Sequence, residues 1–110
     1  MTAHYLVMDI TFLSPPGETD GTFDEFTTRV LDELCKLEDA DAGIIDPDIT
    51  ASLTNRELSV YMGVEADSRR DALRLFSANV RAALHAAGCG TAGWPPPPAD
   101  LPAPREPEYA

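Results

Sequence analysis

Apolar and polar residues alternate over 4–12, and a helical pattern follows that stretch. In the alternating stretch, every second residue is apolar, from Leu6 to Phe12. Beyond it, apolar residues recur at intervals of three and four, as on one face of a helix: Phe23, Phe26, Val30, Leu34 and Leu37. These two periods predict a strand over 4–12 and a helix over 22–39. Thr22 and Glu25 have the spacing of a capping box, which favours a helix start at Thr22.

The second half of the chain repeats this order with an added hairpin. Alternation over 49–54 and again over 58–66 predicts two strands, and Asn55-Arg56 between them indicates a tight turn. Ser68 is a typical N-cap for a helix over 68–87, whose apolar stripe is Leu73, Phe76, Val80, Ala83 and Ala87. The short apolar run 89–94 is predicted as a fourth, edge strand.

The resulting order, βαββαβ, predicts an α+β fold of the ferredoxin-like type. In this sandwich an antiparallel sheet carries two helices on one face, and its other face is open. We expect six residues to be in the core: Phe26, Val30, Leu34, Val60, Phe76 and Val80.

Residues 1–94 are predicted to be one domain, and 95–110 a proline-rich tail. Seven of these last sixteen residues are proline, including four in succession. Proline lacks a backbone donor and favours extended polyproline II structure, so we expect a disordered, solvated spacer that folding does not need. The alternative is that Trp94, Leu101 and Tyr109 anchor the tail to the domain or to a neighbour.

Charge excludes several classes of partner. Nineteen acidic residues against eight basic ones give a net charge of −11. Such a chain repels nucleic acid and anionic membrane, so we expect neither as a partner. No signal peptide and no run of about 20 apolar residues is evident, which predicts a cytoplasmic protein with reduced cysteines at Cys35 and Cys89.

No motif points to catalysis, a cofactor or a metal. The acidic run 38–48 does not match a calcium loop, because the twelfth residue from Asp39 is Thr50 and not glutamate. His85 and Cys89 are four residues apart, but they do not form a recognised zinc pair. The loop 14–21 contains no base that would hold a phosphate, unlike the loop of acylphosphatases. We therefore expect no enzymatic activity.

Two groups of residues are candidates for a partner surface. The spacing of Arg70, Arg74, Arg81 and His85 places all four on one outward stripe of the predicted second helix. Tyr5 and Tyr61 are expected on the open face of the sheet. An ordinary solvated surface is the alternative for both groups.

Three stretches resemble small uncharacterised proteins of high-GC actinobacteria: 37–41, 64–67 and 80–88. The resemblance extends loosely over 1–94 and implies a ferredoxin-like fold without assigning a function.

The leading hypothesis is a non-catalytic protein-interaction or regulatory module that binds a protein partner or a second copy of itself. One alternative is a small-molecule-binding or enzymatic domain of the dimeric α/β-barrel or ACT-like type. Another is an acidic inhibitor or immunity-type protein that covers a basic enzyme, which the net charge of −11 suggests.

Overall fold

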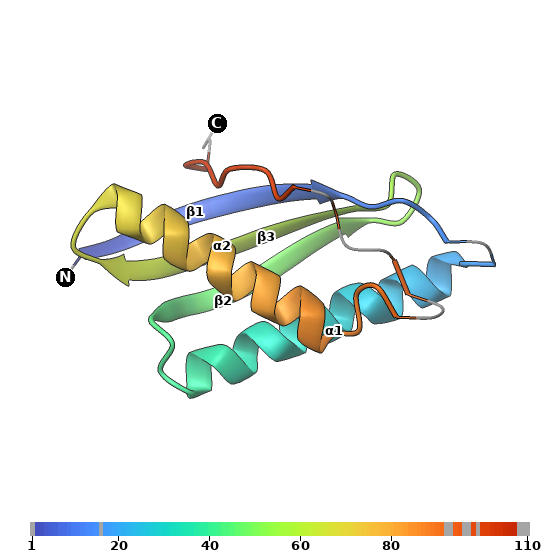
Figure 1. The fold of residues 1–110 in the computed structure, drawn as a ribbon, viewed down its shortest axis with the longest axis horizontal. Coiled ribbons are helices and arrows are strands. Elements are labelled where there is room, and N and C mark those ends of the chain that lie inside the picture. Colours follow the sequence, from blue (N-terminus) through green and yellow to red (C-terminus); the bar gives the residue numbers. More distant parts are fainter. Residues whose placement is uncertain (1, 16, 92–93, 96–97, 99, 108–110) are drawn as a thin grey trace.

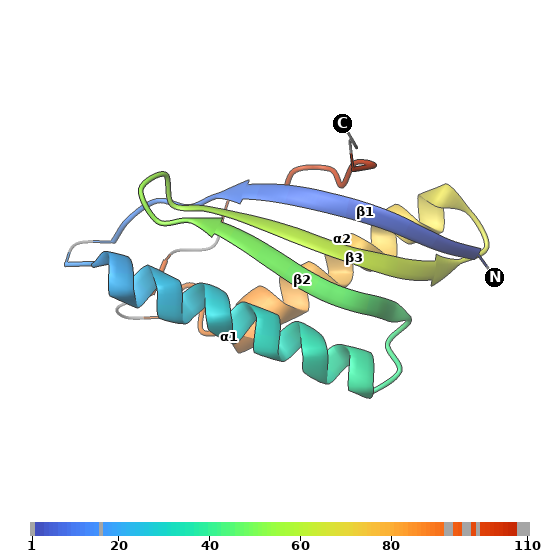
Figure 2. The same ribbon diagram turned by 180° about the vertical axis from the view of Figure 1, so that it is seen from behind.

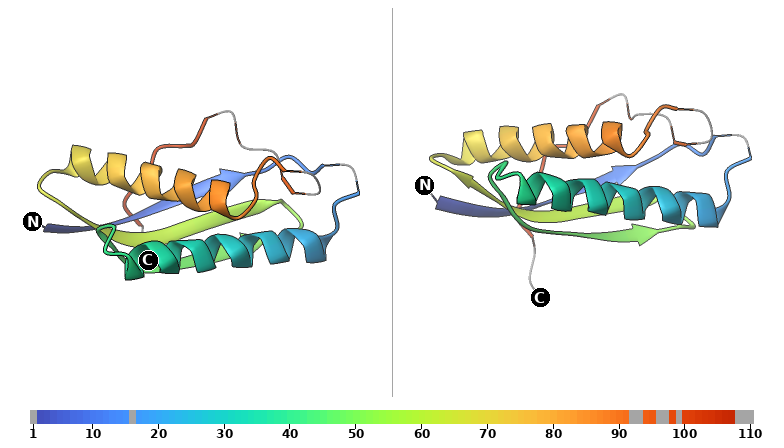
Figure 3. Two further views of the ribbon diagram at one scale, coloured as in Figure 1. Left: turned by 60° about the horizontal axis from the view of Figure 1, so that its bottom comes forward. Right: turned by 90° about the horizontal axis from the view of Figure 1, so that it is seen from below.

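Three antiparallel strands and two helices form the fold in the computed structural model, which describes residues 2–15, 17–91, 94–95, 98 and 100–107. The strands lie in the order β1-β3-β2, and both helices cover the same face of the sheet (Figures 1 and 3). Along the chain the elements are β1 (Thr2–Thr11), α1 (Asp20–Asp39), β2 (Ile44–Ser52), β3 (Glu57–Ala66) and α2 (Arg69–Ala86). The predicted α+β class is therefore confirmed, and the first five elements of the predicted order βαββαβ are present.

The core lies between the sheet and the two helices. All six residues predicted for it have no solvent exposure: Phe26, Val30, Leu34, Val60, Phe76 and Val80. The register of β1 against β3 pairs Leu6 with Met62 and Met8 with Val60, so their buried side chains share this face. The alternation seen in the sequence thus assigned the two faces of the sheet correctly.

The N-cap of α1 differs from the prediction. The helix begins at Asp20, two residues before the predicted start, because the side chain of Thr19 accepts a hydrogen bond from the backbone N–H of Thr22. Glu25 instead forms an ion pair with Arg29 one turn further along the helix. Ser68 caps α2 as predicted, through a bond from the N–H of Asp71.

The β2 strand begins earlier than predicted, at Ile44, and it contains a bulge between Ile45 and Asp48. Asp46 within the bulge has a φ of 49°, which lets the strand continue past Pro47. The connection to β3 is also longer than the predicted two-residue turn. It spans 53–56 and ends at Arg56, whose φ is 51°.

The predicted fourth strand is wrong for the described residues of 89–94. They form turns after α2, and Gly88 and Gly90 have positive φ values of 98° and 87°. Cys89 packs against the core, and the ring of Trp94 lies 6.1 Å from that of Phe26. A path through these two glycines breaks the extended conformation that an edge strand needs.

The described residues of the tail contact the domain, and the last of them lie beside β1, which differs from the solvated spacer expected from composition (Figure 2). Leu101 packs against the core and Pro104 is buried. Arg105 forms an antiparallel bridge with Val7, with N···O distances of 2.8 and 2.9 Å. Of the three predicted anchors, Trp94 and Leu101 make such contacts, and Tyr109 lies outside the described residues. The boundary at residue 94 stays a prediction.

Neither described helix has both the length and the apolar character required to cross a bilayer.

Candidate functional site

The four residues of the predicted stripe on α2, Arg70, Arg74, Arg81 and His85, are all exposed. The opposite side of the helix holds them in place, since Ala72, Phe76, Val80 and Ala83 are buried there without solvent exposure. A helix fixed by such a buried face always presents the same positions to the solvent. We call Arg70, Arg74, Arg81 and His85 the cationic stripe.

The cationic stripe is unusual because its arginines lack ion pairs. Every other lysine and arginine of the chain is paired with a carboxylate, in the pairs Arg29–Glu25, Lys36–Glu33, Arg56–Glu18, Arg69–Glu106 and Arg105–Asp9. Arg70, Arg74 and Arg81 form no ion pair with any residue that the structure describes. In a chain with more than twice as many acids as bases, this leaves positive charge available at one place on the surface.

A groove of about 210 Å³ lies at the C-terminal end of the cationic stripe. Arg81 and His85 line it together with apolar groups of α2, of the turn after it and of the tail: Leu84, Cys89, Pro98 and Leu101. Burial raises the pKa of the Cys89 thiol, so the neutral form of this side chain is favoured. The groove therefore joins an apolar floor to two side chains that donate hydrogen bonds.

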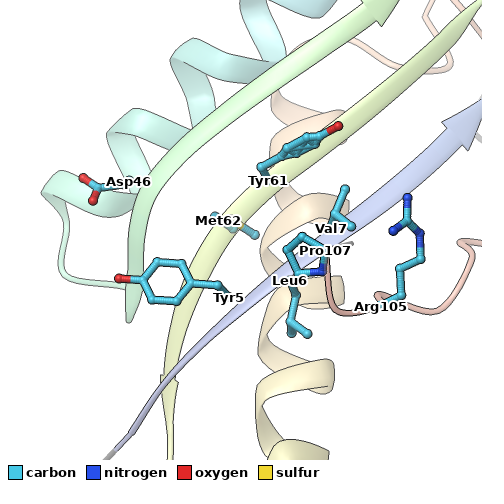
Figure 4. Close-up of a pocket in the computed structure, with 8 residues that line it drawn as sticks. All are labelled: Tyr5, Leu6, Val7, Asp46, Tyr61, Met62, Arg105 and Pro107. Carbon is cyan, nitrogen blue, oxygen red and sulfur yellow. The ribbon is translucent and has the colours of Figure 1, made fainter. Parts of the chain in front are cut away.

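Tyr5 and Tyr61 form a second surface, on the open face of the sheet. Their exposed fractions are 53% and 38%, and they line a groove of about 390 Å³ with Val7, Asp46, Arg105 and Pro107 (Figure 4). The ring of Tyr5 lies over Gly63, where a Cβ atom would come within 2.8 Å of the tyrosine Cε1. The absence of a side chain at Gly63 thus allows this ring to lie against the sheet.

The structure does not bring the two predicted groups together. The cationic stripe belongs to the helical layer, whereas Tyr5 and Tyr61 lie on the opposite face of the sheet (Figures 3 and 4). One partner of ordinary size would contact one of these surfaces and not both.

A network around Asp9 on the open face was not anticipated from the sequence. Ser59 Oγ donates to Asp9 Oδ1 at 2.6 Å, and Arg105 Nη2 donates to Asp9 Oδ2 at 2.9 Å. The hydrogen bond from Ser59, assisted by Arg105, holds the pKa of Asp9 below its usual value of 3.8. The placement of Asp9 on the open face was predictable, but its partner Arg105 is 96 residues away in the chain.

Replacing Asp9 with asparagine is expected to lower the Tm by roughly 2–5 °C at pH 7, because a partly exposed ion pair and its hydrogen bonds are weakened. A lowered native pKa means that the carboxylate stabilises the fold above pH 4 and loses this effect as the pH falls through the native pKa. The melting temperatures of wild type and D9N should therefore converge near pH 2–3. The control is E65Q, an exposed residue on the same face, whose effect should stay near zero. A difference that persists unchanged at low pH would contradict the role of the Asp9 charge.

The residues considered for a metal site are also apart. His85 and Cys89 approach the same groove, but His4 lies on β1 and Cys35 on α1. Within the described part of the chain, no three His, Cys, Asp or Glu side chains gather where they could hold a metal ion. Burial, aided by the carboxylate of Glu38, raises the pKa of Cys35, which makes its thiol a weak nucleophile at neutral pH.

Comparison of the chain with protein-family models, with curated proteins and with solved structures finds no match.

Proposed function

We propose that this chain is a non-catalytic protein-interaction module of ferredoxin-like architecture, and that the cationic stripe of α2 binds an acidic segment of a partner protein. One observation carries the proposal: Arg70, Arg74 and Arg81 are the arginines without an ion pair among the described residues, and all three lie on that stripe. A solvated surface of a strongly acidic chain would pair its few cations with its own carboxylates.

The ferredoxin-like assignment is supported by the strand order β1-β3-β2 and by the two helices on one face. In that architecture the second β-α-β unit returns to the edge of β1. Among the described residues, the tail reaches this edge through one bridge, between Arg105 and Val7. The chain would thus be a ferredoxin-like domain whose last strand, in the part of the tail that the structure describes, is reduced to one paired residue.

A non-catalytic role is supported by the surroundings of the nucleophilic side chains. Both thiols have pKa values raised mainly by burial, which disfavours the reactive thiolate. Ser59 is buried and donates its hydroxyl hydrogen to Asp9, and no described contact links it to a histidine base. The chain has two histidines, and His85 lies in the helical layer away from Ser59.

Charge reversal of the stripe is expected to abolish binding of the partner. Arg74→Glu/Arg81→Glu replaces attraction by repulsion, so recovery of a specific partner from native lysate should fall at least tenfold, about 1.4 kcal/mol. Quantitative pull-down with the immobilised full chain measures this loss. The matched control is a pair of single variants, Arg74→Glu on α2 and Lys36→Glu on α1. Both make the same change of charge, but only Arg74→Glu changes the cationic stripe.

Two results would contradict the proposal. One is an equal loss of recovery in Lys36→Glu and Arg74→Glu, which would show that total charge and not the stripe governs binding. The other is recovery of no specific partner together with turnover in a substrate screen, which would favour an enzyme.

A small-molecule-binding domain is the second candidate, and the groove beside Tyr5 and Tyr61 favours it. Its volume of about 390 Å³ falls in the range of small-ligand pockets, and two aromatic rings line it. A ligand of this groove would raise the melting temperature in a thermal-shift screen of metabolites, and Tyr61→Ala would remove that shift.

A further inference from the structure

The outer edge of β1 has unused pairing capacity. Val7 exchanges both of its backbone hydrogen bonds with Arg105, so its N–H and C=O point away from β3. In an antiparallel pair this direction alternates, and Tyr5 and Asp9 therefore also direct their backbone groups toward the outer edge. Among the described residues, the tail bonds to this edge of β1 only at Val7.

A proline in the tail explains why the pairing does not continue from Arg105 toward Tyr5. In an antiparallel register centred on Val7 and Arg105, Pro107 lies opposite Tyr5. Proline has no N–H, so it cannot donate to the carbonyl of Tyr5. A segment with an ordinary residue at that position would continue the ladder where the tail cannot.

Grooves lie on both sides of this edge. The groove of about 390 Å³ beside Val7 and Tyr61 is on the open face. Another, of about 500 Å³, lies toward α2 and is lined by His4, Arg69 and Glu106. The tail itself lines both grooves, with Arg105 and Pro107 in the first and Glu106 and Pro107 in the second. A strand that replaced the tail would place its alternate side chains where those of Arg105 and Glu106 lie, one on each side of the edge, and sheet-edge sites select extended peptides through such alternate positions.

The carboxylate of Asp9 favours a positively charged side chain on the segment that is added to the sheet. The carboxylate of Asp9 lies beside the edge and receives the guanidinium of Arg105 through both Nε and Nη2. The net charge of −11 also attracts a basic segment and opposes pairing with a second copy of the chain.

We propose that the outer edge of β1 is a docking site for an extended, arginine-bearing segment of a partner protein, and that the tail occupies this site as a placeholder. The placeholder supplies the two features that the partner would supply, a backbone pair at Val7 and a guanidinium at Asp9. It lacks the third, a backbone donor opposite Tyr5, so a partner strand can displace it. This inference is independent of the cationic stripe.

The test uses the full chain and a short synthetic peptide of alternating threonine and valine around one central arginine. Backbone amide shifts in NMR spectra report binding, and we expect changes at Tyr5, Val7 and Asp9. Arg105→Ala weakens the placeholder and should increase the affinity for the peptide about tenfold, while Lys36→Ala should leave it unchanged. Pro107→Thr supplies the missing donor to the tail and should weaken peptide binding.

A peptide with a different central residue and a second variant at Asp9 test the role of charge. Arg105→Ala/Asp9→Asn should bind the peptide about tenfold more weakly than Arg105→Ala, and a peptide with central glutamate should bind Arg105→Ala poorly. Equal binding of the arginine and glutamate peptides, or no shifts at β1 in Arg105→Ala, would overturn the proposal. So would dimerisation of Arg105→Ala in sedimentation without peptide, which would assign the edge to a second copy.

Discussion

Replacing Phe76 with alanine is expected to lower the free energy of unfolding by about 3–5 kcal/mol, because the change leaves a cavity in the core. Phe76 has no solvent exposure and lies on α2 among the buried residues of both helices and the sheet. The loss is a large fraction of the stability of a domain of this size. Urea denaturation followed by circular dichroism measures it.

Leu75→Ala is the matched control, since Leu75 is the next residue of α2 and its side chain is 37% exposed. It should cost less than about 1 kcal/mol. If Phe76→Ala also costs less than about 1 kcal/mol, the register of α2 against the sheet is wrong.

Deletion of residues 95–110 is expected to lower the Tm by at least about 5 °C. The deletion removes the packing of Leu101 and Pro104 and both backbone bonds at Arg105, and it uncovers Val7, which is 2% exposed. Burial of one valine side chain and two hydrogen bonds contributes on the order of 2 kcal/mol or more. Thermal unfolding of the truncated and full chains measures the difference.

This expectation reverses the one drawn from composition, by which the tail is dispensable. Arg105→Ala is the comparison, and it should cost less than the deletion, because it keeps the backbone bridge and the buried proline. An unchanged Tm in the truncated chain would show that the tail is a spacer, as its proline content indicates.

The sequence was sufficient to predict three strands, two helices and the core, though not the absence of a strand over 89–94, because these elements depend on local periodicity. Apolar residues at helical spacing identified the buried faces of α1 and α2, and all six predicted core residues are buried. The cationic stripe was predictable for the same reason, since spacing alone places Arg70, Arg74 and Arg81 on one side of a helix.

Local patterns were insufficient where two signals compete. Thr19 and Thr22 are both suitable N-caps three residues apart, and the choice depends on whether the Thr19 hydroxyl accepts from the N–H of Thr22 or the Thr22 hydroxyl accepts from the N–H of Glu25. The alternation over 49–54 predicted a strand that begins after Pro47, yet a bulge with positive φ at Asp46 lets β2 begin before this proline, at Ile44. Such features follow from the register with β3.

Contacts over long sequence separation could not be predicted at all. Nothing near Arg105 indicates a strand, and its partners Val7 and Asp9 lie at the other end of the chain. The missing ion pairs of the cationic stripe are also a property of the folded chain, because they depend on where every carboxylate lies.

We propose that the cationic stripe of α2 binds an acidic partner, and photo-crosslinking from defined positions is the direct test of this binding. A photoreactive residue in place of Ala78, exposed on α2 next to Arg74, is compared with one in place of Thr50, exposed on the open face. We expect a specific adduct in native lysate from position 78 that is lost at high salt and in Arg74→Glu/Arg81→Glu. A specific adduct from position 50 alone, unaffected by salt or by these substitutions, would contradict it.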